Sequence, residues 1–506
     1  MQHNVIQYLW KTAEKFPDKT AVDDTEEQIS FIELKESACK IAGQIETIGV
    51  KNKPIGVYIP KSAKAVQAFA GISLSGNFYV PLDTKSPDNR ITTILDDLDP
   101  AAVVTDFAHY EHLQQICKCT VWVIEEMLKE EVTEKSLESY LNGPIDTDPV
   151  YTIFTSGSTG KPKGVVISHR GVTDYIDWAI DTFHITENST IGNQAPFYFD
   201  NSTLDIYLMY ATGATLVIVP EMLFAFPADL VDFVNKKKIS FVFWVPSVLI
   251  NVANMDILET KKPEYLKSVF FAGEVMPNKH LNYWRRHLPD CRYVNLYGPT
   301  EITVDCTYYV VEREFSDDEP LPIGFPCRNS DVLILTDRKR LAKQGEQGEL
   351  CVRGSSLALG YYNHPEKTEA SFIQNPLHSH YPETIYCTGD IVYENELGEI
   401  MYVGRGDAQI KHNGYRIELG EIEQAVLGTQ LADNCCAVYD QVHKMIMLFY
   451  QAKTDVRSLD FRKALSTRIP KYMLPSSFTR VEEIKTNHNG KTDRMYYQQL
   501  INQQEK

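Results

Sequence analysis

The sequence predicts an α/β fold with a large N-terminal domain of stacked α/β sheets, a β-rich subdomain and a small α+β domain at the C-terminus. Three observations predict this fold. Short apolar runs alternate with helical patterns along most of the chain, closely spaced short strands replace this alternation after about residue 330, and two glycines interrupt the pattern near residue 405. Strands that alternate with helices are typical of parallel sheets covered by helices.

The first clear helix is expected after Ser30, because Ser30 and Glu33 have the spacing of a capping box. Apolar residues then recur at helical spacing through Ile45. A second helix is expected at 63–74. Buried strands are expected, in chain order, at 54–59, 77–82, 102–105, 121–124, 215–219, 241–245, 269–271 and 293–296.

The β-rich subdomain is predicted from segments such as 348–354, GELCVRG, in which a short strand pattern lies between glycines. Gly404 and Gly406 then loosen the chain between two strand-like segments. We therefore expect a large domain over residues 1–407. Residues 408–506 have their own strand and helix signals and are numerous enough to form a small domain.

Composition excludes several classes of protein. The 506 residues are 43% hydrophobic and 23% charged, which excludes disordered, collagen-like and coiled-coil chains. The 68 acidic residues outnumber 50 Lys and Arg, giving a net charge of -18. Nucleic-acid binding requires clustered cations, so we expect no nucleic-acid partner. An anionic small molecule needs only local positive groups and is not excluded.

The expected compartment is the cytoplasm. The first 16 residues lack the layout of a signal peptide, and no apolar run is long enough to cross a bilayer. The ten cysteines form no C-x-x-C pair and show no metal-binding spacing. We expect reduced, mostly buried thiols.

A loop rich in glycines and hydroxyls follows an apolar strand at residues 155–164, TSGSTGKPKG. Its glycines allow backbone N–H groups to point at one ligand, and its lysines add positive charge, which suits a polyphosphate. It is not a Walker A loop, because Lys161 is followed by Pro162. The alternative is a flexible Ser/Gly linker, which rarely carries lysines so regularly after a buried strand.

Four further clusters carry chemistry-bearing residues at turns. Each of them alone is compatible with an ordinary turn, cap or solvated loop. They are NLYGPTE at 295–301, YCTGD at 386–390, GRGDAQIK at 404–411 with GYRIELGE at 414–421, and NHNGKTDR at 487–494.

Together and in this order, these motifs resemble the adenylate-forming superfamily of acyl-CoA synthetases, luciferases and nonribosomal peptide synthetase adenylation domains. The resemblance covers almost the whole chain. It is strongest to D-alanine:D-alanyl carrier protein ligases and stand-alone amino-acid adenylation domains, through residues 193–207 and 273–278. It implies an ATP-binding, AMP-forming ligase that activates an amino acid and transfers it to a carrier protein.

The resemblance implies where ATP and Mg²⁺ bind. Thr155 and Ser156 open the phosphate loop, Tyr297 lies against adenine, and Thr300 lies near the α-phosphate. Glu301 holds Mg²⁺. Asp390 takes the ribose hydroxyls, with Tyr402 and Arg405 beside it. The remaining nucleotide contacts come from Asn295, Leu296, Gly298, Pro299 and Lys491.

The family uses one pocket for two reactions by rotating its small domain. Asp407 matches the hinge, and Lys491 matches the catalytic lysine that bridges the substrate carboxylate and the phosphates. With Thr300 and Glu301, Lys491 completes the expected catalytic set. After rotation, the hairpin around Gly414 would line the tunnel for a phosphopantetheine thiol. Because few residues follow Lys491, we expect the carrier protein to act in trans.

The expected amino-acid pocket contains Asp200, Ala272, Val304 and Lys491. Asp200 and Asp205 both lie in the family's substrate segment, and Asp200 is the one that matches the α-ammonium partner. A helix cap is the alternative role for Asp200. Aryl- and fatty-acid-activating relatives have no ammonium to bind, so Asp200 separates the amino-acid branch from them.

Three positions depart from the D-alanine ligases. Ala272 replaces a cysteine found in some of them, Leu296 replaces their usual threonine, and Asp305 stands where a small apolar residue is expected. Asp305 could face the pocket and bind a basic or polar side chain, or lie on the surface. D-alanine is the leading substrate, and another small, polar or basic amino acid is the alternative. An acyl- or aryl-CoA ligase and a non-catalytic nucleotide-binding module remain as further hypotheses.

The charge is unevenly divided. Residues 408–506 contain 14 Lys and Arg against 11 Asp and Glu, a net charge of +3, which leaves a net charge of -21 on residues 1–407. Carrier proteins of the family are usually acidic. The small domain is therefore the half that repels them less.

Overall fold

The computed structural model describes residues 3–130, 141, 143–156, 162–405, 409–485 and 492–504. The chain forms two compact units. The first contains Met1–Asp83, Leu98–Ile153 and Gly164–Gly406, and the second contains Thr84–Asp97, Phe154–Lys163 and Asp407–Lys506. The predicted domain boundary at 407/408 falls on residues 406–408, outside the described residues, and stays a prediction.

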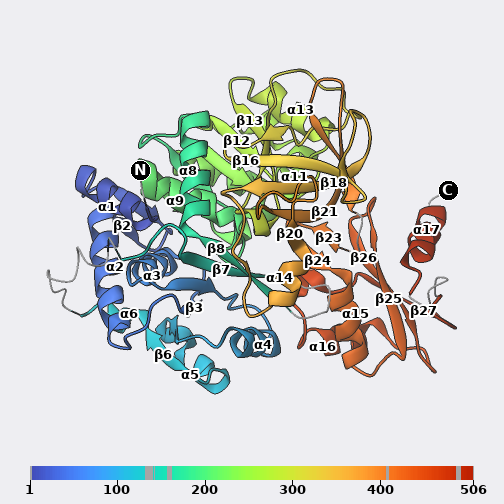
Figure 1. The fold of residues 1–506 in the computed structure, drawn as a ribbon, viewed down its shortest axis with the longest axis horizontal. Coiled ribbons are helices and arrows are strands. Elements are labelled where there is room, and N and C mark those ends of the chain that lie inside the picture. The colour runs from blue at the N-terminus through green and yellow to red at the C-terminus, as the bar shows by residue number, and fades with distance from the viewer. Residues whose placement is uncertain are drawn as a thin grey trace. The chain divides into compact units, whose positions relative to one another are not determined.

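A nine-stranded sheet is the largest element of the first unit (Figure 1). Its central strands pair in parallel, as the alternation of strands and helices predicts. Across the sheet the order is β15 (Phe325–Pro326), β14 (Thr307–Val310), β13 (Arg292–Tyr297), β12 (Ser268–Phe271), β11 (Phe241–Trp244), β9 (Thr190–Asn193), β10 (Thr215–Ile218), β1 (Thr20–Asp23) and β2 (Gln28–Ser30).

A second, seven-stranded sheet is also mostly parallel. Its order is β19 (Gly360–Tyr361), β8 (Lys163–Ser168), β7 (Pro149–Thr155), β4 (Phe78–Pro81), β3 (Pro54–Tyr58), β5 (Ala102–Thr105) and β6 (Thr120–Val123). Every strand expected between residues 54 and 124 or between 215 and 296 is therefore present.

Helices of the first unit pack around these sheets, and α8 and α9 lie side by side (Figure 1). The capping box predicted at Ser30 is present at the start of α2, with both of its reciprocal hydrogen bonds. One apolar cluster includes Val104 of the seven-stranded sheet, Phe243 of the nine-stranded sheet and Leu204 of α9, so it joins all three. The helices are α1 (Ile6–Lys15), α2 (Phe31–Glu46), α3 (Ala63–Leu74), α5 (Phe107–Ile116), α6 (Ile124–Met127), α8 (His169–Phe183), α9 (Asn201–Thr212), α10 (Pro227–Lys236), α11 (Pro246–Asn254), α12 (Ile257–Thr260), α13 (Asn278–His287) and α14 (Pro365–Ser371), with 3₁₀ turns at Glu221–Ala225 and η3 (Thr300–Ile302).

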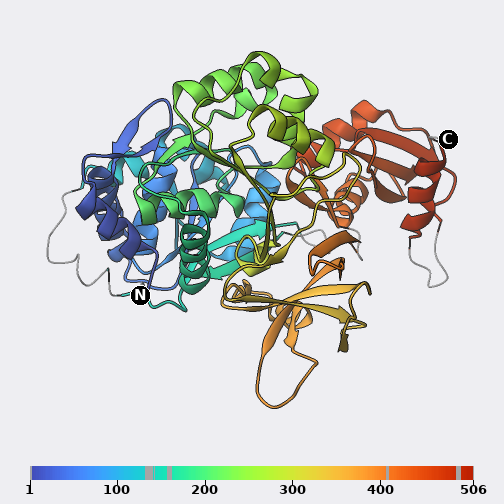
Figure 2. The same ribbon diagram turned by 90° about the horizontal axis from the view of Figure 1, so that it is seen from above.

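The β-rich subdomain expected after residue 330 is a six-stranded antiparallel sheet (Figure 2). Figure 2 shows that it extends away from the two large sheets. Its path is β17 (Arg340–Leu341), β16 (Ser330–Thr336), β18 (Gly348–Gly354), β21 (Thr384–Glu394) and β20 (Phe372–Gln374), with β22 (Ile400–Arg405) paired to β21.

The second unit has its own apolar core, which includes Ile422, Leu448 and Phe461. It contains a hairpin of β23 (Gln409–His412) and β24 (Tyr415–Glu418), and a sheet of β25 (Asn434–Asp440), β26 (Met445–Gln451) and β27 (Ser477–Val481). Its helices are α4 (Asp88–Leu98), α15 (Leu419–Gly428), α16 (Ser458–Leu465) and α17 (Arg494–Gln504), with a 3₁₀ turn at Lys471–Met473. Together the two units confirm the predicted fold class.

The helices and the cysteines bear on two further predictions made from the sequence. In the part of the chain that the structure describes, no helix has the length and apolarity required to cross a membrane. All ten cysteines are free thiols, and eight of them are buried, as expected.

Candidate nucleotide and amino-acid site

The segment after β13 folds into a tight loop that carries several of the predicted site residues. Gly298 and Pro299 connect the strand to η3, and Thr300 and Glu301 begin that turn. A side chain at Gly298 would bring its Cβ within 2.3 Å of the Val304 carbonyl oxygen. The loop therefore folds back on itself, and only glycine allows this approach. Thr303 and Val304 both have positive φ, which is strained for β-branched residues and is frequent at functional sites.

Neighbouring residues of β13 have opposite environments. Leu296 is buried in the large apolar cluster with Ala272 and Val304. Tyr297 packs in a separate cluster with residues of the six-stranded sheet. Asn295 is held by a 2.8 Å hydrogen bond from its Nδ2 to the carbonyl of Pro322. Leu296 and Tyr297, both predicted nucleotide contacts, thus face two different apolar clusters from adjacent positions on one strand.

The structure brings the predicted adenine and ribose residues together. The Tyr297 hydroxyl donates to Asp390 Oδ2, and Arg405 Nη1 donates to Asp390 Oδ1 at 3.0 Å. Arg405 also donates to the Thr388 carbonyl at 3.1 Å. The ring of Tyr402 lies 6.2 Å from that of Tyr297. These residues come from β13, β21 and β22, so two sheets contribute to one cluster.

Electrostatics in this cluster favour a neutral Tyr297. Burial and the charge of Asp390 raise the pKa of Tyr297 well above its usual value, which keeps the phenol neutral and able to donate. A carboxylate has about four lone-pair positions, and its two protein donors leave acceptor capacity for a ribose diol. The geometry therefore fits the role that the family resemblance implies.

Glu301 is completely buried, and its Oε1 accepts a 2.8 Å hydrogen bond from the hydroxyl of Tyr361. The backbone of Glu301 is fixed by a 2.9 Å hydrogen bond from the Ala358 amide to its carbonyl. Thr300, the adjacent predicted residue, is 7% exposed. A buried carboxylate oriented by a second group is the kind of ligand that binds Mg²⁺ together with substrate phosphates. The residues present thus fit the metal that the resemblance implies.

Tyr361 was not among the predicted site residues. It lies on the two-residue strand β19, 60 residues from Glu301, and packs against Phe372. In the sequence, Tyr361 is simply the first of two tyrosines that follow Gly360. No local pattern links them to the NLYGPTE motif.

Asp200 and Asp205 have different environments. Asp205 is fully buried, accepts a 2.8 Å hydrogen bond from Asn193 Nδ2, and has its pKa raised to about 8 by burial. Asp200 is partly exposed at the N-terminal end of α9 and makes no side-chain capping hydrogen bond. The helix-cap alternative for Asp200 is therefore not what the structure shows. Of the two acids, Asp200 is the one that a ligand could reach.

Asp305 is buried, with 2% of its surface exposed, which excludes the surface-acid alternative. The Tyr175 hydroxyl donates to its Oδ2 at 2.6 Å. Burial first, and then the charges of Asp305 and Asp200, raise the pKa of Tyr175 well above its usual value. Asp305 is in direct contact with Tyr175, whereas Asp200 contributes only the smallest of these effects. Tyr175, on α8, is a second residue that sequence analysis did not predict.

The phosphate-loop residues lie in the second unit. Ser156 Oγ donates to the Arg416 carbonyl at 2.9 Å and accepts from the Glu418 amide at 3.2 Å. The Thr155 hydroxyl oxygen is buried and has no hydrogen-bond partner among the described residues. An orphaned buried hydroxyl is costly, and a phosphate oxygen would satisfy it. The rest of the loop at 157–161, the hinge residue Asp407 and the catalytic candidate Lys491 lie outside the described residues.

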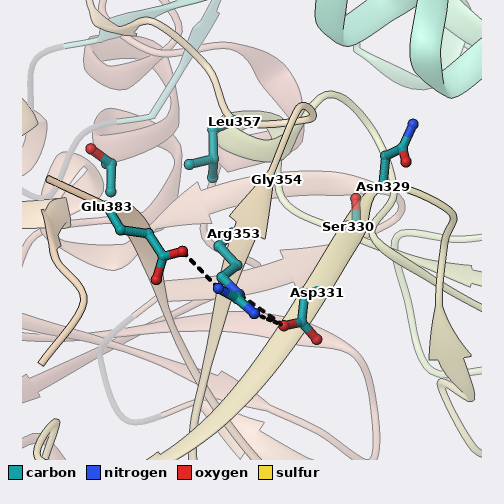
Figure 3. Close-up of a pocket in the computed structure, with 8 residues that line it drawn as sticks. Asn329, Ser330, Asp331, Arg353, Gly354, Leu357 and Glu383 are labelled. Atoms are coloured by element: carbon teal, nitrogen blue, oxygen red, sulfur yellow. Dashed lines mark hydrogen bonds and ion pairs between the residues drawn. The ribbon is translucent and has the colours of Figure 1, made fainter. Parts of the chain in front are cut away.

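A pocket of about 530 Å³ lies elsewhere in the first unit, on the six-stranded sheet (Figure 3). Arg353 bridges Asp331 and Glu383 there, at 2.8 and 2.6 Å. None of the predicted site residues lines it. Its charges are already paired with one another, so we assign it no ligand.

Comparison with known proteins places this geometry in a family. The AMP-binding enzyme family model matches residues 9–362. The Delta-poly-L-ornithine synthetase of Acinetobacter baumannii (strain AB307-0294) is 33% identical over 503 residues, which cover 98% of this chain and 36% of that protein. The chain thus spans about a third of that relative. The D-alanine--D-alanyl carrier protein ligase of Lacticaseibacillus casei (strain BL23) is 31% identical, with 98% of each chain covered.

A solved structure gives the same fold. The Vibrio cholerae adenylation domain AlmE, crystallised with glycyl-adenosine-5'-phosphate, superposes with a TM-score of 0.85 at 21% identity, covering 99% of this chain and 98% of that one. The family model covers well over half of the chain, and the D-alanine ligase is matched over nearly its whole length. The chain therefore belongs to the family of AMP-binding enzymes.

Proposed function

We propose that the protein is an ATP-dependent amino acid:carrier protein ligase that forms AMP. In the first step, the substrate carboxylate attacks the α-phosphorus of ATP, the bond to pyrophosphate breaks, and an aminoacyl-AMP forms. In the second step, the phosphopantetheine thiol of a carrier protein acting in trans attacks the acyl carbon and AMP leaves. The observation that supports this best is the buried cluster of Tyr297, Asp390 and Arg405, which combines an aromatic face with a carboxyl group held by two donors.

The residues of the chain would act on charge and position. Asp390 and Arg405 hold the ribose side, Tyr297 the base, and Thr300 the α-phosphate. Lys491 offsets the repulsion between the carboxylate and the phosphates. Glu301 would hold Mg²⁺, which supplies electrostatic stabilisation of the phosphate oxygens when bound.

Asp200 supports an amino acid as the substrate. Its carboxylate is accessible at the end of a helix and is not used as a cap. It would pair with the substrate α-ammonium. D-alanine is the first candidate, because the D-alanine ligase matches this chain over almost the full length of both proteins.

A basic amino acid is the second candidate, and Asp305 favours it. A methyl side chain brings no counter-charge to a buried acid, whereas the terminal ammonium of ornithine or lysine would pair with Asp305. Asp200 and Asp305 would then each bind one of the two ammonium groups of the substrate. The relative named for ornithine supports the same choice.

Amino-acid-dependent exchange of pyrophosphate into ATP tests these proposals on a panel of D- and L-amino acids. Exchange with ornithine or lysine, strongly reduced in Asp305→Asn but not in the exposed control Asp290→Asn, would support the basic substrate. Exchange with D-alanine that Asp305→Asn leaves intact would support the first candidate. A second assay offers benzoate or fatty acids together with coenzyme A. Formation of a coenzyme A thioester in this assay, without exchange on any amino acid, would contradict amino-acid activation. ATP binding without exchange on any acid would indicate a non-catalytic nucleotide-binding module.

The carrier protein is expected to dock with the help of charge. Residues 408–506 carry a small excess of positive charge in a chain of net charge -18. Carrier turnover should therefore slow as salt rises, because surface attraction is screened. Turnover that does not change with salt would count against this docking mode.

A further inference from the structure

Two cysteines lie opposite each other on adjacent strands of the six-stranded sheet. Cys351 on β18 and Cys387 on β21 are register partners in an antiparallel pair. The Cys351 thiol donates to Cys387 Sγ, with 3.4 Å between the sulfur atoms. The two residues lie 36 positions apart, so C-x-x-C spacing could not reveal them. Side chains directly opposite in an antiparallel pair are close enough for a covalent cross-link.

The pair lies in a small apolar cluster with Leu333, Leu335 and Ile385, separate from the main core. Cys351 is completely buried and Cys387 is 6% exposed. Beside them lies a charged pair, in which Arg338 donates two hydrogen bonds of 2.6 and 2.9 Å to Glu349. The Arg338 side chain is 47% exposed, so this edge of the cluster is close to solvent.

The two thiols are chemically unequal. The hydrogen bond from Cys351 lowers the pKa of Cys387, and this effect exceeds the opposing effects of burial and of the Glu349 charge. The same hydrogen bond, with burial, raises the pKa of Cys351. Cys387 is therefore the thiol that forms a thiolate first, and a thiolate is the nucleophilic form.

Glu349, Cys351 and Cys387 also have the composition of a metal site, since their ligand atoms lie within 4.8 Å of one another. The surrounding charges disfavour this use. Glu349 is already engaged by Arg338 and by the Gly389 amide at 3.0 Å. The guanidinium would repel a cation, whereas a Cys387 thiolate is stabilised chiefly by the hydrogen bond from Cys351. The neighbourhood thus suits oxidation better than metal binding.

We propose that Cys351 and Cys387 are a reversible dithiol–disulfide pair that a hydroperoxide oxidises. The Cys387 thiolate attacks the outer peroxide oxygen, the O–O bond breaks, and a sulfenic acid forms with release of water or an alcohol. Cys351 sulfur then attacks the sulfenic sulfur, its proton joins the departing hydroxide as water, and the disulfide forms. Both thiols are oxidised by two electrons in total, and the peroxide is reduced.

The disulfide would act on the nucleotide site, a consequence that rests on the proposed function of Asp390. The strand register shifts between Glu349 and Cys351, so β21 bulges immediately after Cys387. The bulge carries Thr388 and Asp390. The Thr388 hydroxyl donates to the Leu350 carbonyl, and the Thr388 carbonyl accepts from Arg405. Shortening the sulfur–sulfur distance to a covalent bond would displace this bulge. We expect oxidation to weaken ATP binding.

The test uses a Cys117→Ser/Cys119→Ser background, because those two sulfurs are also close, at 3.3 Å, and would oxidise as well. Hydrogen peroxide should remove two hydrogen atoms from the intact mass, and peptide mapping should join residues 351 and 387. A reducing dithiol should restore the original mass. Cys351→Ser and Cys387→Ser, each added to the background, should abolish the change, and Cys291→Ser should not. If a serine variant fails to fold, the linked peptide in the parent background still decides the question.

Two results would overturn the proposal. One is no linked peptide at a peroxide dose that oxidises Cys291. The other is binding of one zinc ion that requires both thiols and prevents oxidation, which would make the pair a metal site. KM for ATP should rise about fivefold or more on oxidation, in the range of couplings between sites. If the disulfide forms and KM for ATP does not change, the coupling between the disulfide and the nucleotide site is rejected, but the cysteine pair is not. An Asp390→Ala variant with a normal KM for ATP would instead show that the proposed nucleotide site is wrong.

Discussion

The hydroxyl of Tyr361 donates a 2.8 Å hydrogen bond to Oε1 of Glu301, and both residues are buried. The bond joins the short strand β19 to the turn after β13 and restricts the direction of the carboxylate. If Glu301 holds Mg²⁺, Tyr361 is a positioning residue for the ion.

Tyr361→Phe should therefore raise the Mg²⁺ concentration needed for half-maximal pyrophosphate exchange by about tenfold, the lower end of effects for residues that orient metal ligands. Saturating Mg²⁺ should restore most of the activity. Titration of exchange activity with Mg²⁺ measures this, with the partly exposed Tyr362→Phe as the matched control. A variant whose activity falls equally at all Mg²⁺ concentrations would argue for a purely structural role.

Asp390→Ala should raise KM for ATP by about 10- to 100-fold while changing KM for the amino acid little. This range corresponds to the loss of hydrogen bonds to a charged group. Tyr297→Phe, which removes one donor to Asp390 and keeps the ring, should have a smaller effect. Initial rates at varied ATP and amino-acid concentrations separate the two constants. The exposed Glu396→Ala provides the control, and equal changes in both constants in Asp390→Ala would contradict a ribose role.

Gly298→Ala should lower both stability and affinity for the amino acid. The added Cβ would lie 2.3 Å from the Val304 carbonyl oxygen and 2.6 Å from the Asp305 Cα, and both are backbone atoms that cannot rotate away. We expect a loss of about 1–3 kcal/mol in the free energy of unfolding, as for other overpacked sites. Gly404→Ala meets open space and should be tolerated. A melting temperature for Gly298→Ala equal to that of the unaltered protein would disprove the steric argument.

Asp205 should make the folded state less stable as pH rises. Its pKa is about 8 in the folded protein and near 3.8 in an unfolded chain, so between these values the folded state binds the extra proton. The resulting stabilisation is complete below about pH 4 and is lost progressively up to about pH 8, by about 1 kcal/mol per pH unit. Asp205→Asn removes this dependence and should flatten the melting temperature between pH 5 and 8. Parallel pH profiles for the two proteins would show that Asp205 ionises normally.

Local patterns were sufficient to predict most of the fold. The capping box at Ser30 and the strands predicted at 102–105 and 241–245 are encoded within a few residues, and all three were found, the last as Phe241–Trp244. The contacts of the site were not predictable in the same way. Tyr175 lies 130 residues from Asp305, so only the folded chain brings the phenol to the acid. The sequence left open whether Asp305 faces a pocket or the surface, because its burial depends on the fold of the loop after Gly298.

The hydrogen bond between Tyr297 and Asp390 joins the nine-stranded sheet to the six-stranded sheet within the first unit. A nucleotide held by both residues would therefore add a cross-link to the backbone hydrogen bonds between Gly324 and Ile400, which already connect the two sheets beside β15 and β22. Such a ligand would suppress independent opening of the six-stranded sheet, and the backbone amides of β21 and β22 would exchange with deuterium more slowly when ATP is present. Occupation of the site would thus strengthen the existing connection between these two sheets and make their unfolding more cooperative.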